Sequence, residues 1–170
     1  MTNISGRIAI DCSADDCAHY LDAFVAQRRA SAEHSVRLEI GVPVADLALR
    51  REVIATLIPR AVGASTSETH IARYDLGWEA DKGGPYPAFA GTLTVAPGGD
   101  ERSTLELAGS YQPPAGIIGQ AFDAAMGRRI ATATLRALLD TLKEGIDSVR
   151  RSAVNSQLDE LTRRFVPPSQ

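Results

Sequence analysis

The residues best placed to do chemistry in this sequence are His70 and Tyr74, which lie four positions apart in a stretch of alternating apolar and polar residues. Side chains at every second position of a β-strand share a face, so residues 68–80 would place His70, Tyr74 and Trp78 on one side. On an apolar face, His70 could act as a general base or donate to a ligand carbonyl, and Tyr74 could help to move protons. The alternative is a histidine whose hydrogen bonds are satisfied within a packed core.

Other types of reactive site find little support. His19 and His34 have the surroundings of surface residues and no metal-site spacing, so we expect no bound metal. There is no Gly-x-Ser-x-Gly elbow for a hydrolase, and residues 116–119 lack the Gly-Lys-Ser/Thr ending of a phosphate loop, so we expect no cofactor. Cys12 and Cys17 are the only cysteines, and two free thiols in a reducing cytoplasm are the simpler interpretation.

Composition and charge favour a soluble globular protein. The 170 residues carry a net charge of −3 and include 44% hydrophobic residues. The double arginines at 28–29 and 150–151 are too short for a nucleic-acid stripe, so we expect no nucleic-acid partner. We see no secretion signal and no apolar run that approaches 18 residues, so we expect no membrane span and a cytoplasmic location.

Period-two alternation and turn residues predict a mainly antiparallel sheet with one short helix near its start. We predict strands over residues 8–12, 36–42, 51–61, 68–80, 89–95 and 105–111, a helix over 14–29 that begins after a Ser13 cap, and a hairpin turn over 97–100. Residues 51–61 have no clear inner face, and a helix over 44–57 is the competing interpretation.

A long amphipathic helix follows the last strand and is expected to close the domain. Apolar residues recur at steps of three or four from Ile118 to Val149. A long helix on a curved antiparallel sheet encloses a cavity, which would place a ligand between the inner sheet face and residues 116–150. The expected contacts are His70, Tyr74, Trp78, Leu93, Leu107, Tyr111, Phe122 and Met126. We also expect a bulkier residue at Gly109 to weaken binding more than it weakens the fold.

The chain beyond residue 150 has a different apolar pattern. The stripe slips by one residue and resumes at Val154, Leu158, Leu161 and Phe165, which predicts a break near residue 152 and a short terminal helix. We therefore divide the chain into a domain of residues 1–150 and an amphipathic extension of residues 151–170. So short a helix needs a docking surface, either on its own subunit or on a second copy in a homodimer. We favour the homodimer.

Two local sequences resemble a known family. Residues 76–80 read Leu-Gly-Trp-Glu-Ala and residues 86–93 read Tyr-Pro-Ala-Phe-Ala-Gly-Thr-Leu, which is similar to the central hairpin of a bacterial, polyketide cyclase/dehydrase-like branch of the START-like (SRPBCC) superfamily. Residues 109–119, followed by Asp123, resemble its strand-to-helix junction. The resemblance covers residues 7–150. It implies an α+β helix-grip fold, in which a curved antiparallel β-sheet wraps around a long C-terminal α-helix.

The same fold hosts several functions, so three hypotheses remain open. The first is non-catalytic binding of a small hydrophobic or aromatic molecule, or of a lipid. The second is a polyketide cyclase or dehydratase type of enzyme that acts on an aromatic or poly-carbonyl substrate, with His70 or Tyr74 moving protons. The third is a protein-interaction module whose cavity is filled by side chains.

Overall fold

The computed structural model describes residues 2–28, 34–44, 47–60, 71–80, 88–112 and 124–165. In chain order, the described elements are β1 (Thr2–Ile10), α1 (Ala14–Gln27), β2 (Ser35–Val44), β3 (Leu47–Arg60), β4 (Ala72–Ala80), β5 (Ala88–Gly99), β6 (Arg102–Gln112) and α2 (Ala124–Phe165).

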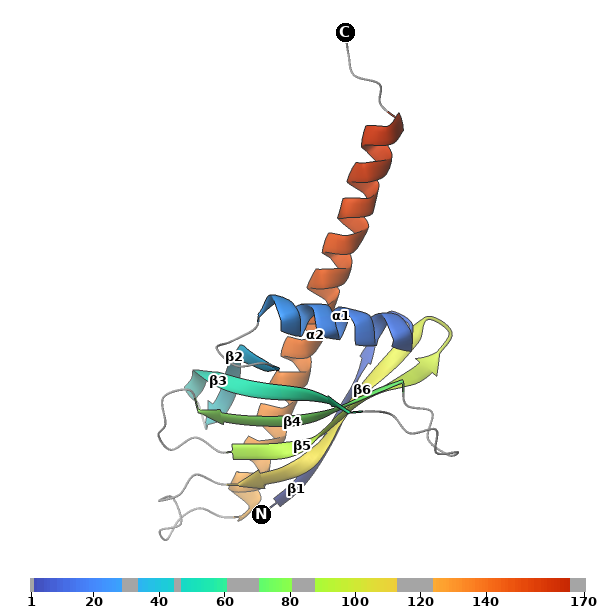
Figure 1. Cartoon of the computed structure of the whole chain (residues 1–170). Coiled ribbons are helices and arrows are strands. Elements are labelled where there is room, and N and C mark those ends of the chain that lie inside the picture. Colours follow the sequence, from blue (N-terminus) through green and yellow to red (C-terminus); the bar gives the residue numbers. More distant parts are fainter. Residues whose placement is uncertain are drawn as a thin grey trace.

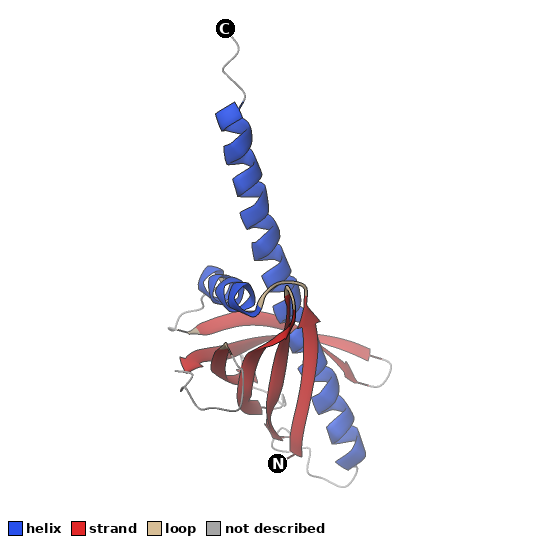
Figure 2. Ribbon diagram, turned by 90° about the vertical axis from the view of Figure 1, so that its right-hand side faces the viewer, coloured by secondary structure: helices blue, strands red, loops and turns tan. Residues whose placement is uncertain are grey.

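The six strands form one antiparallel sheet in the order β1-β6-β5-β4-β3-β2. The sheet curves around the first part of α2, and α1 lies across α2 at one end of the sheet (Figure 1). The view in Figure 2 shows the same curvature from the side, with α2 running past the sheet. The predicted α+β architecture, a curved antiparallel sheet wrapped around a long C-terminal helix, is confirmed.

The start of α1 follows directly from its sequence. The Ser13 hydroxyl oxygen accepts a hydrogen bond from the Asp16 backbone N–H at 3.1 Å and donates to the Asp16 carboxylate at 2.8 Å. Cys17, Leu21 and Phe24 then recur at helical spacing and are buried, as the sequence predicts. The cap fixes where α1 begins, and the apolar stripe fixes which face it turns toward the sheet.

The competing helix over residues 44–57 is wrong, because residues 47–60 form β3. β3 pairs with β2 over residues 47–56 and with β4 over residues 53–60. Ala55 and Leu57 face the core, whereas the Ile58 side chain is 47% exposed. The sequence obscures this parity because an apolar residue occupies the outer face as well as the inner one.

Two predicted boundaries need small corrections. Cys12 lies beyond the end of β1 and not within it, because β1 begins earlier and ends at Ile10. The β5–β6 turn is centred on Asp100 and Glu101 and not on residues 97–100, because β5 continues to Gly99. Gly99 and Glu101 have φ angles of 118° and 54°, so this turn uses left-handed backbone at a glycine and at one non-glycine residue.

α2 is one continuous helix, so the predicted break near residue 152 is wrong. The described residues 148–156 contain neither proline nor glycine. The Ser152 and Ser156 hydroxyls donate to backbone carbonyls one turn earlier, at 3.1 and 2.9 Å, without interrupting the helix. The slip in the apolar stripe instead marks where α2 leaves the domain and continues past α1 (Figure 1). None of the described helices combines the length and apolarity that a membrane crossing needs.

Candidate functional site

The inner face of the sheet presents its side chains in rows that cross several strands. The antiparallel register places Trp78, Phe89 and Tyr111 opposite one another on β4, β5 and β6. The next row contains Leu76, Gly91 and Gly109, and the row after it contains Tyr74, Leu93 and Leu107. Each of these aromatic and leucine side chains is buried, so the predicted inner faces of these strands are confirmed.

We call Trp78, Phe89 and Tyr111 the aromatic row. These side chains are 3%, 3% and 1% exposed. The Trp78 and Phe89 rings are nearly parallel, with centroids 4.3 Å apart and an interplanar angle of 10°. The row lies toward the end of the sheet where β1 begins, marked N in Figure 1, and thus at the end opposite α1. Because the Trp78 and Phe89 rings stack face to face, the row is a compact aromatic cluster whose polar groups are the Trp78 indole N–H and the Tyr111 hydroxyl.

Two glycines provide room for the ring of Phe89. Gly91 and Gly109 are register partners on β5 and β6, and a Cβ atom at either would lie 2.7 Å from Phe89 Cζ. A Cβ at Gly109 would also lie 2.5 Å from Gly91 Cα and would collide with the Ala90 carbonyl. A bulkier residue at Gly109 would therefore disturb the sheet itself, and the expectation that it weakens binding more than it weakens the fold stays a prediction.

The aromatic row carries two polar groups, the indole N–H of Trp78 and the hydroxyl of Tyr111. Trp78 Nε1 is fully buried and has no hydrogen-bond partner among the described residues. Burial raises the pKa of Tyr111 to about 12, so its phenol stays neutral at physiological pH and keeps its proton for donation. Both polar groups of the aromatic row are therefore uncharged donors at physiological pH.

The α1 end of the inner face is built differently. The Tyr74 hydroxyl donates to the Asp22 carboxylate on α1 at 2.9 Å. Burial, reinforced by that carboxylate, raises the pKa of Tyr74 far above its usual range. Tyr74 is therefore a neutral donor that ties α1 to β4, and a role for it in proton transfer stays a prediction.

Two cysteine thiols lie close to the hydrogen bond between Tyr74 and Asp22. Cys12 and Cys17 lie just before and just after the first turn of α1 and are both buried and free, as predicted. Burial raises the pKa of Cys12, and it raises the pKa of Cys17 to about 11, so both remain thiols at neutral pH. Ser103 Oγ is buried beside the two thiols, and its interaction with them lowers their pKa values by less than burial raises them. The environment is that of inert core cysteines.

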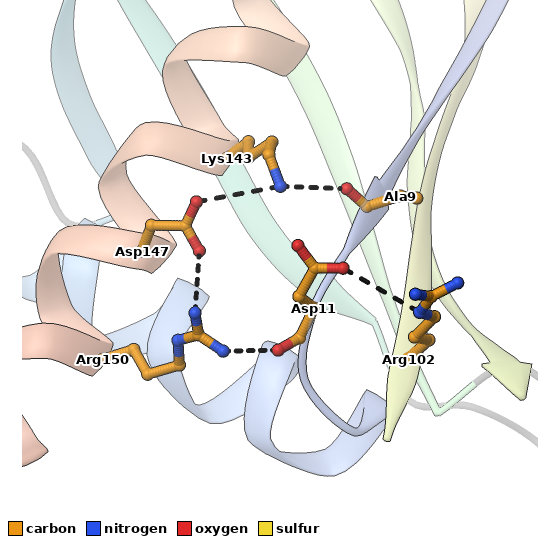
Figure 3. Close-up of polar contacts among 6 residues, drawn as sticks. All are labelled: Ala9, Asp11, Arg102, Lys143, Asp147 and Arg150. Carbon is orange, nitrogen blue, oxygen red and sulfur yellow. Dashed lines mark hydrogen bonds and ion pairs between the residues drawn. The ribbon is translucent and has the colours of Figure 1, made fainter. Parts of the chain in front are cut away.

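Charged side chains of α2 cover the free edge of β1 (Figure 3). Lys143 Nζ donates to the Ala9 carbonyl at 3.2 Å, and Arg150 donates to the Asp11 carbonyl. Asp147 lies between the two cations, with N···O distances of 3.7 Å to Lys143 and 3.9 Å to Arg150, and Arg102 reaches the Asp11 carboxylate at 4.0 Å. These contacts satisfy edge carbonyls and fix α2 on the sheet.

The structure brings together only part of the predicted site. Trp78 and Tyr111 share the aromatic row, and Leu93 and Leu107 pair two rows away, beside Tyr74. His70 and Phe122 lie outside the described residues. Met126 lies in the first described turn of α2, where side chains are not described.

Sequence reasoning missed two residues as parts of these sites. Neither Phe89 nor Asp22 is among the contacts expected from the sequence. The alternation of Phe89 with Gly91 was the available signal, because a large ring followed by a glycine two positions later leaves room for the ring. The pairing of Asp22 with Tyr74 spans 52 residues and left no local signal.

Comparisons with known proteins agree on the fold. No protein-family model matches the chain, and no curated protein matches it. A conserved protein from Geobacillus kaustophilus superposes with a TM-score of 0.55 at 13% identity, covering 86% of this chain and 96% of that one. A START superfamily protein from Mycobacterium smegmatis gives 0.53 at 12% identity over 86% and 98% of the two chains.

A third solved structure is the Zhui aromatase/cyclase from Streptomyces sp. R1128, with a TM-score of 0.51 at 12% identity. The match covers 89% of this chain and 95% of that enzyme. At such identities the likeness concerns the fold. Together with the six-stranded sheet curved around α2, these matches show that this chain has the START-like helix-grip fold.

Proposed function

We propose that this chain binds a small, planar, hydrophobic or aromatic molecule against the aromatic row. The observation that carries the proposal is the alignment of Trp78, Phe89 and Tyr111 across three strands, with the first two rings parallel. Clusters of aromatic side chains with a few polar groups are typical of sites that hold small apolar molecules. The fold that this chain shares with a START superfamily protein is consistent with the same class of ligand.

The ligand in this proposal is held between the aromatic row and the first part of α2. Leu93 and Leu107 extend the apolar surface toward the centre of the sheet. His70, Phe122 and Met126 remain proposed contacts from the sequence, as does Tyr74 at the far end. All three side chains of the row are almost completely buried by the protein itself, so in this proposal the ligand displaces groups that cover them.

A matched pair of variants tests the proposal. Phe89→Leu removes the ring beneath Trp78, whereas Phe24→Leu removes an equally buried ring, also 3% exposed, at the α1 end. We expect both variants to be destabilised, and only Phe89→Leu to weaken binding of N-phenyl-1-naphthylamine by about tenfold or more. Binding is read as quenching of Trp78, the single tryptophan.

Two results would overturn the proposal. One is a native parent protein that takes up no probe, with Trp78 emission unchanged. The other is an equal loss of binding in the two variants, which would make the effect one of general stability. Native mass spectrometry of freshly purified protein adds the identity of any retained ligand by its mass.

Cyclase-type activity is the second candidate function, and its substrate would bind at the same inner face of the sheet. The Zhui neighbour is an aromatase/cyclase by name, and an aromatic poly-carbonyl chain would suit the aromatic row. Turnover of such a substrate by the purified protein, lost in Tyr74→Phe with binding retained, would favour the enzyme over the carrier.

We further propose that residues 151–170 pair with a second copy of the chain. The apolar side chains on the last part of α2 are each about half exposed, namely Val154, Leu158 and Leu161. Within the described residues, this apolar stripe is therefore not packed against its own subunit. We expect light scattering to report a dimer for the full chain and a monomer for a chain that ends at Arg151. If both are monomers at micromolar concentration, the pairing is absent.

A further inference from the structure

The indole N–H of Trp78 is a donor that has no acceptor in the part of the chain that the structure describes. Nε1 is inaccessible to solvent and makes no hydrogen bond to any described residue, on a side chain that is 3% exposed. Leaving a buried donor unpaired is costly, and folded proteins rarely do so without a reason. The same structure pairs the Tyr74 hydroxyl across 52 residues, so the unpaired group at Trp78 stands out.

The indole is also held in place by its neighbours. One face stacks on Phe89, whose ring tip is fixed above Gly91 and Gly109. Ala55 on β3 is the cross-strand neighbour on the other side. A ring constrained in this way keeps its N–H in a defined direction, which is the arrangement that gives a binding site its selectivity.

We propose that Trp78 is a specificity-determining residue whose indole N–H donates to an uncharged carbonyl oxygen of a planar aromatic ligand. This inference rests on the proposed function and names its ligand class, an aromatic ketone or a related ring carbonyl. A neutral acceptor fits better than a carboxylate, because the desolvation that keeps Tyr111 neutral also opposes an ionised ligand group. The stacking on Phe89 holds the indole in place, and its N–H supplies the discrimination.

The test uses two ligands of the same shape and a single-atom change in the protein. Fluorenone and fluorene share a planar tricyclic frame, and only fluorenone has the carbonyl. Because Trp78 is the only tryptophan, growth on β-(3-benzothienyl)alanine replaces its N–H by sulfur without altering any other residue. Growth on [15N-indole]tryptophan gives one indole N–H signal in the nuclear magnetic resonance spectrum.

We expect the parent protein to bind fluorenone about tenfold more tightly than fluorene, which corresponds to about 1.4 kcal/mol. The indole proton signal should move downfield with fluorenone and much less with fluorene. The preference should disappear in the benzothienyl protein, whose affinity for fluorene should stay within about twofold of the parent. Tyr111→Phe is the control for the second donor of the row and should retain the preference.

The outcomes separate this inference from the proposed function. If both ligands bind equally and the indole signal does not respond to the carbonyl, the Trp78 inference fails and the binding proposal stands. If the preference vanishes in Tyr111→Phe and persists in the benzothienyl protein, Tyr111 is the donor and the inference fails. If neither ligand binds, the proposed function and the inference fail together.

Discussion

At both ends of the sheet's inner face, a glycine leaves room for a phenylalanine ring. At the α1 end, a Cβ at Gly145 of α2 would lie 2.5 Å from the Phe24 ring, so the glycine allows α1 and α2 to approach closely. At the aromatic end, Gly91 and Gly109 allow the Phe89 ring to lie on the sheet. In both places a large ring occupies the space that a side chain would otherwise fill.

The ends differ in how they treat polar groups. Tyr74 at the α1 end is paired with Asp22, whereas Trp78 at the aromatic end has a donor without a partner among the described residues. The first arrangement fastens one element to another. The second leaves hydrogen-bonding capacity unused in a buried place, which folded proteins rarely do without a reason. The comparison therefore separates an end with a structural contact from the end where we propose that the ligand binds.

The largest effect should come from the packing of α2, on which both ends depend. Leu142 is fully buried, so Leu142→Ala leaves a cavity and should lower the free energy of unfolding by about 2–5 kcal/mol. Leu158→Ala, at a side chain that is 55% exposed in the single subunit, should change the free energy of unfolding by less than about 0.5 kcal/mol when measured at a concentration below that at which the proposed dimer forms. Denaturant unfolding of both variants measures the contrast, and equal effects would mean that α2 is packed along its whole length.

Desolvation at the aromatic end should be visible at alkaline pH. The Tyr111 pKa is about 12 when folded and about 10 when unfolded, so its contribution to stability is complete below pH 10 and is lost as the pH rises to 12. Over that range, the free energy of unfolding of Tyr111→Phe should fall less steeply than that of the parent, by about 2–3 kcal/mol in total. Parallel pH profiles for the two proteins would show that Tyr111 is not desolvated.

Alanine at the two glycine sites sharpens the comparison. Gly145→Ala and Gly109→Ala should each lower the free energy of unfolding by about 1–3 kcal/mol, because the new methyl group meets a ring or the backbone. Only Gly109→Ala should also weaken binding of N-phenyl-1-naphthylamine to the folded protein, since only it displaces Phe89. Gly77→Ala is the control, because its Cβ meets Phe89 O at an ordinary 3.4 Å. Equal binding losses at Gly109 and Gly145 would remove the distinction between the ends.

The smallest effect on the free energy of unfolding is expected from the hydrogen bond between Tyr74 and Asp22. Tyr74→Phe removes one hydrogen bond to a carboxylate on the exposed side of α1, which can be hydrated instead, so the loss should be about 0.5–1.5 kcal/mol. Probe affinity should stay within about twofold of the parent in equilibrium titrations. A large loss of affinity would extend the binding site to the α1 end.

Local patterns explain why much of the fold was predictable. Alternation along β4 and β6 predicts the buried faces of Tyr74, Trp78 and Tyr111, and the Ser13 cap predicts the start of α1. β3 was ambiguous because Ile58 is apolar yet exposed. The break predicted near residue 152 failed because a shift in apolar pattern reports a change of surroundings, whereas helix continuity depends on the backbone.

The candidate site was predictable only in part, since it depends on register. The sequence indicates which side chains share a face of one strand, but not that Trp78 meets Phe89 across β4 and β5, nor that Tyr74 reaches Asp22. Whether a buried donor finds an acceptor is a property of the folded molecule. The unpaired Trp78 N–H therefore has no counterpart in the sequence pattern.

The position of the ligand itself is the most direct test of the account. Isotope-filtered nuclear Overhauser spectra of the protein with bound fluorenone would report which side chains lie within about 5 Å of its ring protons. The account predicts contacts to Trp78, Phe89 and Tyr111, and none to Phe24 at the α1 end. Contacts confined to the exposed leucines of α2, or to Phe24 without the aromatic row, would contradict it.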